Sequence, residues 1–324
     1  MENELKIEKP EIKEKEPKIS YHILYGAHRT AEDFKKLKEA LEKADVYVPE
    51  MVGWNLGGAL IFNSLSMGAI TPEQMAEIYQ IKQDSPYFKI CETIYNSKKP
   101  ILFADISRNH ELLQERRLNI GSFNLALSLF RRGEFPLALK VIRGSSEKLS
   151  NYFEGREKII KQTLKNSVRQ LSEEHPQLKD KKDIKVLLTL GIGHTQVYHS
   201  LKKKEESVSR EFTETPFIFN FLGEIDRRHR LSKNKEISNE LLAKFILDDL
   251  MIPELGEITQ NSNKMIKVSR KIISKLNLKD IERISKELGE NPEKTITDVL
   301  EARGVKVPKT EEEMDEMLEP KKRK

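Results

Sequence analysis

The sequence predicts an α/β fold, with a mostly parallel sheet flanked by helices and a helical C-terminal extension. Short and nearly continuous apolar segments are typical of parallel strands that are covered on both faces. Helical patterns lie between these segments, and such alternation indicates an α/β domain. Beyond residue 207 helical periodicity dominates. The candidate strands are residues 21–26, 46–49, 101–106 and 186–190, and residues 207–214 could add an edge strand.

Several helical segments begin with recognisable capping signals. Thr30 is a candidate N-cap, and Asp33 follows it three positions later. Thr71 and Gln74 have the spacing of a capping box, with a proline between them at the first helical position. A longer apolar periodicity over residues 156–171 predicts another helix, which leads towards the last main strand.

The C-terminal region is predicted to be helical. Helices are expected to begin near Pro216 and at Ser238, and Gly304 follows the last long one. The helix from Ser238 carries an apolar stripe that another surface must cover. We expect this stripe to pack on the α/β domain and to help form the wall of its ligand crevice. The stripe consists of Leu241, Leu242, Phe245, Ile246 and Leu250.

Composition divides the chain into four segments. Residues 1–19 are nearly all Lys, Glu and Pro with isolated apolar residues, which predicts a disordered charged tail. Residues 20–232 should form the α/β domain, and residues 233–306 should form a helical extension or a lid. Residues 307–324 are expected to be a second charged tail, with a short helix over residues 311–318.

Charge and composition argue against several classes of protein. Lys and Arg number 57 against 52 Asp and Glu, and this net charge of +5 does not by itself indicate nucleic-acid binding. No apolar segment has the roughly 20 residues that a membrane span needs, and the N-terminal residues lack the apolar core of a secretory signal. Cys91 is the only cysteine, so no internal disulfide can form. A cytoplasmic protein is therefore expected, and its oligomeric state is left open.

Polar side chains follow each of the main predicted strands. Ligands of open α/β sheets bind at the carboxyl ends of the strands, so we predict a shared crevice there. The alternative is that a single histidine at such a position is only a cap or a partly exposed polar residue. The strand-end residues are His28, Glu50, Asp105 and His194. Glycines beside the histidines would allow a tight turn or the close approach of a ligand. The candidate cofactor-binding residues are therefore Gly26, Gly191, Gly193 and Asp105.

Three of four short motifs resemble those of a known superfamily. The turn after the last main strand reads Gly191-Ile192-Gly193-His194, which fits a G-x-x-H motif, and Glu50 ends an earlier strand. A helix start reads "GREKIIKQTL", with Arg156 followed by an acid. On these motifs, residues 21–202 resemble the superfamily of Tiki and TraB proteins, erythromycin esterases and ChaN-like haem-binding proteins, with a TraB-like layout. The first motif differs, because Tyr25 stands where the family has a glycine.

The resemblance implies three chemistries for one crevice: metal-dependent peptide hydrolysis, ester hydrolysis through His and Glu, or haem binding. The residues themselves suit two of these. His28, Glu50 and His194 could hold a divalent transition metal such as Mn, Co or Zn, which would lower the pKa of a bound water. Without a metal, either histidine could act as a general base oriented by the glutamate.

Arg156 could act in the crevice or support it. In the crevice it would stabilise an oxyanion or hold an anionic group, and otherwise it would pair with Glu50 or Asp105 to neutralise buried charge. The predicted function is therefore a hydrolase of peptide or ester bonds, acting on a small-molecule or peptide ligand through His28, Glu50, Arg156 and His194. The alternative is a non-catalytic ligand-binding or regulatory protein of the same fold.

Overall fold

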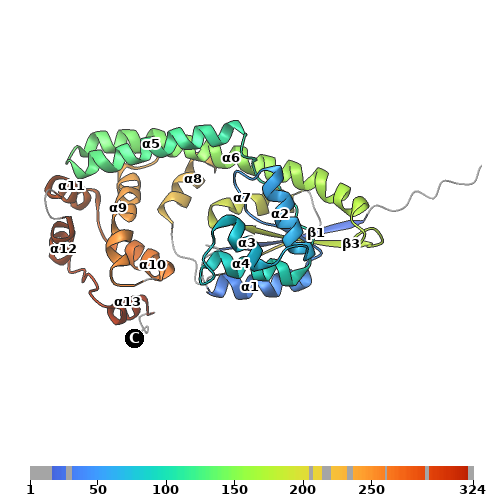
Figure 1. Cartoon of the computed structure of the whole chain (residues 1–324). Helices are drawn as coiled ribbons and strands as arrows, with labels where there is room; N and C mark the ends of the chain where they lie inside the picture. The colour runs from blue at the N-terminus through green and yellow to red at the C-terminus, as the bar shows by residue number, and fades with distance from the viewer. Residues whose placement is uncertain are drawn as a thin grey trace, which may run out of the picture.

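The computed structural model describes residues 17–26, 31–203, 207–213, 220–231, 236–259, 261–288 and 292–319. Figure 1 shows two parts joined along a long helical hairpin: a sheet with helices on both faces, and a bundle of C-terminal helices at the other end. This arrangement confirms the predicted α/β fold with a helical C-terminal region. Among the described residues, no helix combines the length and the apolar character that crossing a membrane requires.

All strand pairs of the sheet are parallel. The strands are β1 (Lys18–Tyr25), β2 (Val46–Val48), β3 (Asp183–Leu190) and β4 (Val208–Phe212), and their order is β2-β3-β1-β4. The central strands β1 and β3 are mostly buried, as their apolar sequences predict. The residues of β4 are exposed or half-buried, which fits the edge strand expected at 207–214. β1 also begins inside the segment that was expected to be a charged tail.

The strand predicted at residues 101–106 is wrong. Ile101 forms only an isolated parallel bridge with Tyr47, and the chain then leaves the sheet. Two local features explain this. β2 is three residues long and offers little edge to pair with, and the Asp105 side chain accepts a hydrogen bond from the backbone N–H of Ile106 at 2.8 Å. The apolar side chains of this segment are still buried, so the pattern correctly indicated burial but not a strand.

The helices account for most of the remaining described chain. Those before β3 are α1 (Ala31–Lys43), α2 (Leu56–Met67), α3 (Pro72–Tyr79), α4 (Pro86–Ser97), α5 (Glu111–Arg131) and α6 (Phe135–Glu174). Those after it are η1 (Ile192–His194), α7 (Thr195–Lys202), α8 (Phe221–Leu231), α9 (Asn239–Gly256), α10 (Ser262–Ile273), α11 (Leu278–Glu287), α12 (Pro292–Ala302) and α13 (Glu311–Leu318). α3 begins with the predicted capping box of Thr71 and Gln74, whereas Thr30 lies outside the described residues.

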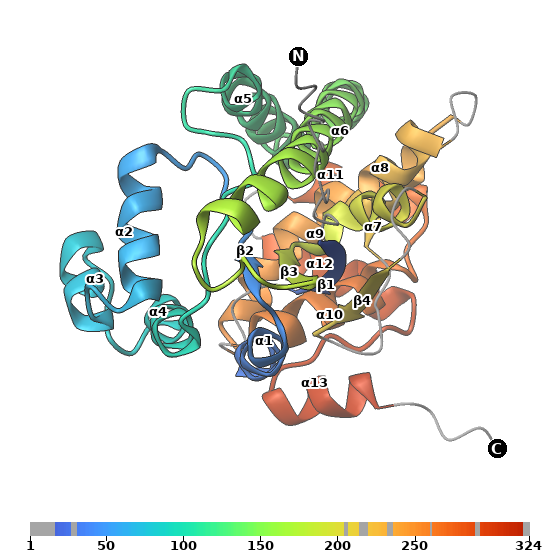
Figure 2. The ribbon, with the colours of Figure 1, turned by 90° about the vertical axis from the view of Figure 1, so that its right-hand side faces the viewer.

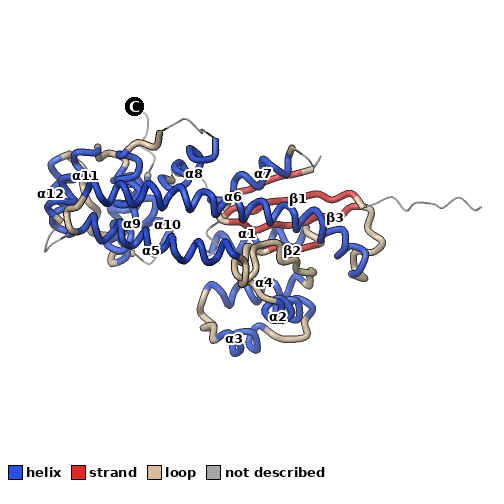
Figure 3. Tube along the Cα trace, turned by 90° about the horizontal axis from the view of Figure 1, so that it is seen from above, coloured by secondary structure: helices blue, strands red, loops and turns tan. Residues whose placement is uncertain are grey.

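Helix α6 is much longer than the sequence predicts. It has 40 residues, of which the apolar periodicity identified only residues 156–171. Its first half pairs with α5 in a hairpin, and Figure 3 shows the two helices side by side along the molecule. Gly155 permits this close pairing, because a Cβ there would lie 3.0 Å from the Leu112 side chain of α5. Tertiary packing thus extends the helix through a stretch that is rich in glycine and serine.

The sheet lies between two layers of helices. On one face, apolar residues of β1 and β3 pack against α6 and α7, with Ile160, Leu164 and Val168 at the centre of that core. On the other face they pack against α1, α2, α3 and α4. Figure 2 shows α1–α4 on one side of the strands and α6 and α7 on the other. This layering leaves the carboxyl ends of the strands free to form a site.

A third core lies at the far end of the hairpin. Residues of α5 and α6, including Phe130 and Ile142, pack there with α8–α13. The predicted α9 stripe is buried in this core, and the short helix expected at 311–318 is α13, which buries Met314 in it. This core contains residues from both sides of residue 232. The predicted domain boundary at that residue stays a prediction. None of the described residues that line the cavity reported below belongs to α9, so the expectation that α9 forms a wall of the crevice is not met by this cavity.

Candidate active site

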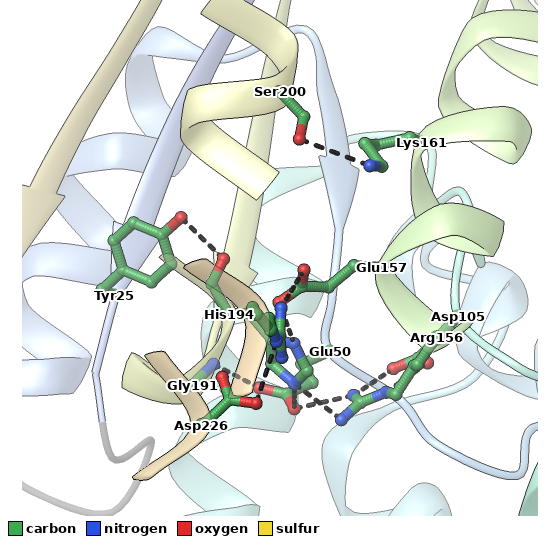
Figure 4. Close-up of polar contacts among 11 residues, drawn as sticks. Tyr25, Glu50, Asp105, Arg156, Glu157, Lys161, Gly191, His194, Ser200 and Asp226 are labelled. Carbon is green, nitrogen blue, oxygen red and sulfur yellow. Dashed lines mark hydrogen bonds and ion pairs between the residues drawn. The ribbon is translucent and has the colours of Figure 1, made fainter. Parts of the chain in front are cut away.

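Four of the predicted site residues meet at the carboxyl edge of the sheet. Glu50 lies two residues beyond β2, and His194 follows β3 in the short turn η1. Asp105 lies beside them, and Arg156 reaches all three from α6 (Figure 4). His28 lies outside the described residues, so its place in the site stays a prediction.

Arg156 is the centre of this cluster. Its Nε donates to Asp105 Oδ1 at 2.7 Å, and its Nη2 donates to Asp105 Oδ2 at 2.5 Å and to Glu50 Oε1 at 2.7 Å. Only 3% of the residue is exposed. Burial alone would lower the pKa of the guanidinium, but Asp105 and Glu50 outweigh it and raise that pKa. Arg156 therefore stays charged and neutralises buried carboxylates, which is one of the two roles predicted for it.

His194 lies between this guanidinium and a second carboxylate. Nη1 of Arg156 lies 2.8 Å from His194 Nε2, and a guanidinium can only donate, so Nε2 is the acceptor in this contact. The proton of the neutral ring is then on Nδ1, which lies 3.2 Å from Glu157 Oε1. Phe153 packs edge-on against the ring at a centroid distance of 5.3 Å. The imidazole is thus fixed on three sides.

The surroundings of His194 favour its protonation. Burial lowers the pKa of the imidazole, but hydrogen bonding to Glu157 and Glu50 raises it by more, so the net direction is upward. Glu50 Oε1 lies 3.4 Å from Nε2, close enough to accept a proton bound there. In the neutral form Nε2 accepts from Arg156, and protonation of Nε2 would replace this contact with a hydrogen bond to Glu50.

Sequence reasoning missed the charged residues that lie behind His194 and contact Glu157. Glu157 Oε2 accepts from Arg230 Nη1 at 2.7 Å, and Arg230 Nε donates to Asp226 at 2.8 Å. Burial raises the pKa of Asp226, although Arg230 opposes the shift. The acid after Arg156 was the only sequence signal for Glu157. Nothing in the charged sequence of α8 marked Arg230, which is 73 positions further along the chain.

The glycines at the strand ends serve close contacts within the protein. Gly191 donates its backbone N–H to Glu50 Oε2, and a Cβ at Gly191 would lie 3.1 Å from that oxygen. A Cβ at Gly26 would lie 2.4 Å from Asp33 Oδ1. A Cβ at Gly193 would meet no atom within 4 Å. Packing therefore leaves little room for a side chain at Gly26 or Gly191, and a ligand role for any of the three glycines stays a prediction.

A cavity of about 300 Å³ opens beside the cluster, between the sheet and α1, α2 and α4. Most of its lining is apolar, and Glu50 lies in its wall. The Glu50 side chain is 19% exposed, against 3% for that of His194 and 4% for that of Arg156. Glu50 is thus the member of the cluster that a ligand in this cavity would meet first.

The described residues do not fit a divalent metal ion. They contain no group of three His, Cys, Asp or Glu side chains arranged to hold one. Glu50, Asp105 and His194 all turn towards the guanidinium of Arg156, which already supplies positive charge at their shared point. The predicted metal site of His28, Glu50 and His194 also depends on a residue outside the described part of the chain.

Comparisons with protein-family models, with curated proteins and with solved structures returned no match to this chain. The resemblance to the Tiki, TraB, erythromycin-esterase and ChaN-like superfamily therefore stays a prediction that rests on the three matching motifs. Any proposal about function therefore rests on the geometry of the site.

Proposed function

We propose that this protein is a hydrolase of ester or amide bonds in which Glu50, Arg156 and His194 act together. One observation supports this most strongly: Glu50 lies in the wall of a mainly apolar cavity and is held by a buried arginine within reach of a buried histidine. Carboxylates and histidines fixed in this way are the usual acids and bases of hydrolysis.

In the proposed reaction, Glu50 accepts a proton from a water molecule as that water adds to the carbonyl carbon of the substrate. The bond to the leaving alcohol or amine then breaks, and the proton passes to the leaving group. The proton can move between Glu50 Oε1 and the nearby Nε2 of His194, whose pKa is raised. Arg156 holds the glutamate in position and stabilises negative charge nearby.

One observation favours the alternative of a non-catalytic ligand-binding protein. The described contacts of Arg156 engage Nε, Nη1 and Nη2 with other residues of the protein. Such an arginine has a complete structural role in neutralising Asp105 and Glu50. In this alternative the cavity would bind a ligand without turnover, and loss of the Glu50 charge would alter binding only.

Hydrolysis of a panel of fluorogenic esters and peptides by the purified protein tests the proposal. Glu50→Gln keeps the shape of the side chain but removes the base, so hydrolysis should fall by roughly 10²–10⁴-fold. Glu73→Gln on α3 is the matched control, because its carboxylate is exposed and far from the cluster in the chain. The alternative holds if no member of the panel is turned over, or if Glu50→Gln retains the full rate at unchanged melting temperature.

A further inference from the structure

The cavity beside Glu50 has the character of a binding site for an apolar group. Its walls include aliphatic residues of several elements, such as Leu37 of α1 and Ile94 of α4, together with the aromatic rings of Phe62 and Tyr47. Tyr47 directs its hydroxyl to Thr189 at 3.1 Å, so this polar group is already satisfied. An occupant would therefore gain mainly from apolar contact.

The size of the cavity limits its occupant. Its volume is about 300 Å³. An apolar cavity of about 150 Å³ is known to hold one benzene molecule, so this one has room for roughly twelve non-hydrogen atoms. A linear aliphatic chain of that length, or two small fused rings, would fill it.

The charges of the lining favour an uncharged occupant over an anion. Glu50 and Asp33 are the carboxylates among the described lining residues, and no lysine or arginine is among them. Arg156 compensates Glu50 from behind the wall, but a carboxylate placed in the cavity would still face the two acids and would find no lysine or arginine partner among the described lining residues. An ester or amide would meet no such repulsion, whereas the acid released from it would.

The first turn of α4 lies at the mouth of the cavity. Tyr87 lines the cavity although it is 59% exposed, so it stands at the mouth. Tyr79, at the end of α3, is 43% exposed, and its ring lies 6.3 Å from that of Phe62 inside the cavity wall. Apolar side chains thus continue from the protein surface into the cavity, as an apolar ligand requires.

We propose that this cavity binds the apolar group of an uncharged substrate, namely an ester or amide that carries an aliphatic or aromatic moiety of roughly twelve non-hydrogen atoms. The proposal rests on the proposed hydrolase function for the reaction that follows binding. It makes a separate claim about binding, which compounds that cannot be hydrolysed will test.

Trp54 provides a direct readout of occupancy. It is the only tryptophan of the chain, and its ring lies 5.7 Å from that of Phe103, which in turn lies 6.1 Å from that of Phe62 in the cavity wall. Titration of the full chain with primary alcohols from butanol to dodecanol should change the Trp54 fluorescence in a saturable way. Affinity should rise about fourfold for each added methylene until the cavity is full. Carboxylates of equal length should bind at least tenfold more weakly.

Two substitutions at Cys91 provide matched variants within the cavity. Cys91 lines it from α4 and is buried. Cys91→Phe fills part of the space and should weaken binding of decanol at least tenfold, whereas Cys91→Ala leaves the space open and should retain it. Melting temperatures of both variants identify a loss of folding, and in that case the chain-length series on the unaltered protein decides.

The outcomes separate the two proposals. Saturable binding of alcohols without hydrolysis of any ester would support the cavity assignment and reject the hydrolase. Hydrolysis of esters with no dependence on chain length would leave the hydrolase standing and overturn the cavity assignment. Equal affinity for alcohols and carboxylates, or equal binding by the Cys91→Phe and Cys91→Ala variants, would also overturn it.

Discussion

His194 lies at a point where small changes in protonation alter several contacts. Its Nδ1 faces Glu157, and its Nε2 faces both Arg156 and Glu50. Three of the four strand-end residues expected from the sequence, together with Arg156, do meet here. For Glu50 and His194 the polar residue after an apolar segment was a sufficient signal, because the carboxyl ends of parallel strands lie at one edge, whereas Asp105 comes from a segment that is not a strand.

The raised pKa of His194 leads to a prediction about pH. Because the folded protein holds the proton more tightly than the unfolded chain, this residue stabilises the fold fully below its ordinary pKa of 6.5, and the contribution is lost as pH rises through the folded value. The difference in melting temperature between the parent and His194→Gln should therefore be larger at about pH 5.5 than at about pH 8.5. His199→Gln, exposed on α7, is the control. A difference that grows towards alkaline pH would contradict the assignment.

The two glycines of the β3 turn make opposite predictions. Gly191→Ala places a Cβ 3.1 Å from Glu50 Oε2 and disturbs the hydrogen bond from the Gly191 amide, so unfolding free energy should fall by about 1–3 kcal/mol. Gly193→Ala meets open space and should stay within about 0.5 kcal/mol of the parent. Urea unfolding of both variants measures this. Equal losses of unfolding free energy in the two variants would show that the conformation of the turn, and not the contact with Glu50, requires glycine.

At the scale of elements, α8 is the least expected contributor to the site. It carries Arg230 and Asp226 to the carboxylate that orients His194. Such a contact depends on how the chain folds back after β4, which no local pattern specifies. The length of α6 was missed for a similar reason, since pairing with α5 sustains helix through its weakly periodic first half. Predicting a strand at residues 101–106 failed because burial and strand formation share one apolar signal.

Removal of the Arg230 charge tests the role of α8. Arg230→Met leaves Glu157 buried without its guanidinium partner, so unfolding free energy should fall by about 3–5 kcal/mol. Arg227→Met is the control on the same helix, because Arg227 is exposed and its ion pair among the described residues is with Glu224, which Arg228 also contacts. Its stability should be close to that of the parent. If the two variants unfold at the same urea concentration, α8 does not support the site.

At the scale of the whole molecule, the long α5–α6 hairpin joins two cores that the sequence suggested only in outline. The alternation of apolar segments with helical patterns predicted the sheet, and the helical periodicity beyond Ser238 predicted the C-terminal helices. The packing of the C-terminal helices on the hairpin was not predictable. The apolar residues of α5 that contact α9 give the same helical pattern whichever partner they pack against. The cavity beside Glu50 could not be predicted either, since residues from three separate helices and from the sheet line it.

Truncation after Ser232 tests whether the rest of the protein depends on the C-terminal helices for stability. It removes α9–α13 and exposes Phe130, Leu139 and Ile142, each of which is at least 94% buried in the intact core. We expect a lower melting temperature and increased binding of a hydrophobic dye, measured by thermal unfolding and by fluorescence. A truncated chain of unchanged stability that binds no more dye would show that the hairpin does not need its C-terminal partners.

The central claim is that Glu50 and His194 act as one chemical centre held by Arg156. The most direct test measures kcat/KM for ester hydrolysis by Glu50→Gln, His194→Gln and the double variant. Residues that act as a unit are strongly non-additive, so the double variant should lose little more than the worse single variant. Losses that multiply in the double variant would mean that the two residues contribute independently. Full activity in either single variant would show that Glu50 and His194 do not act as one chemical centre.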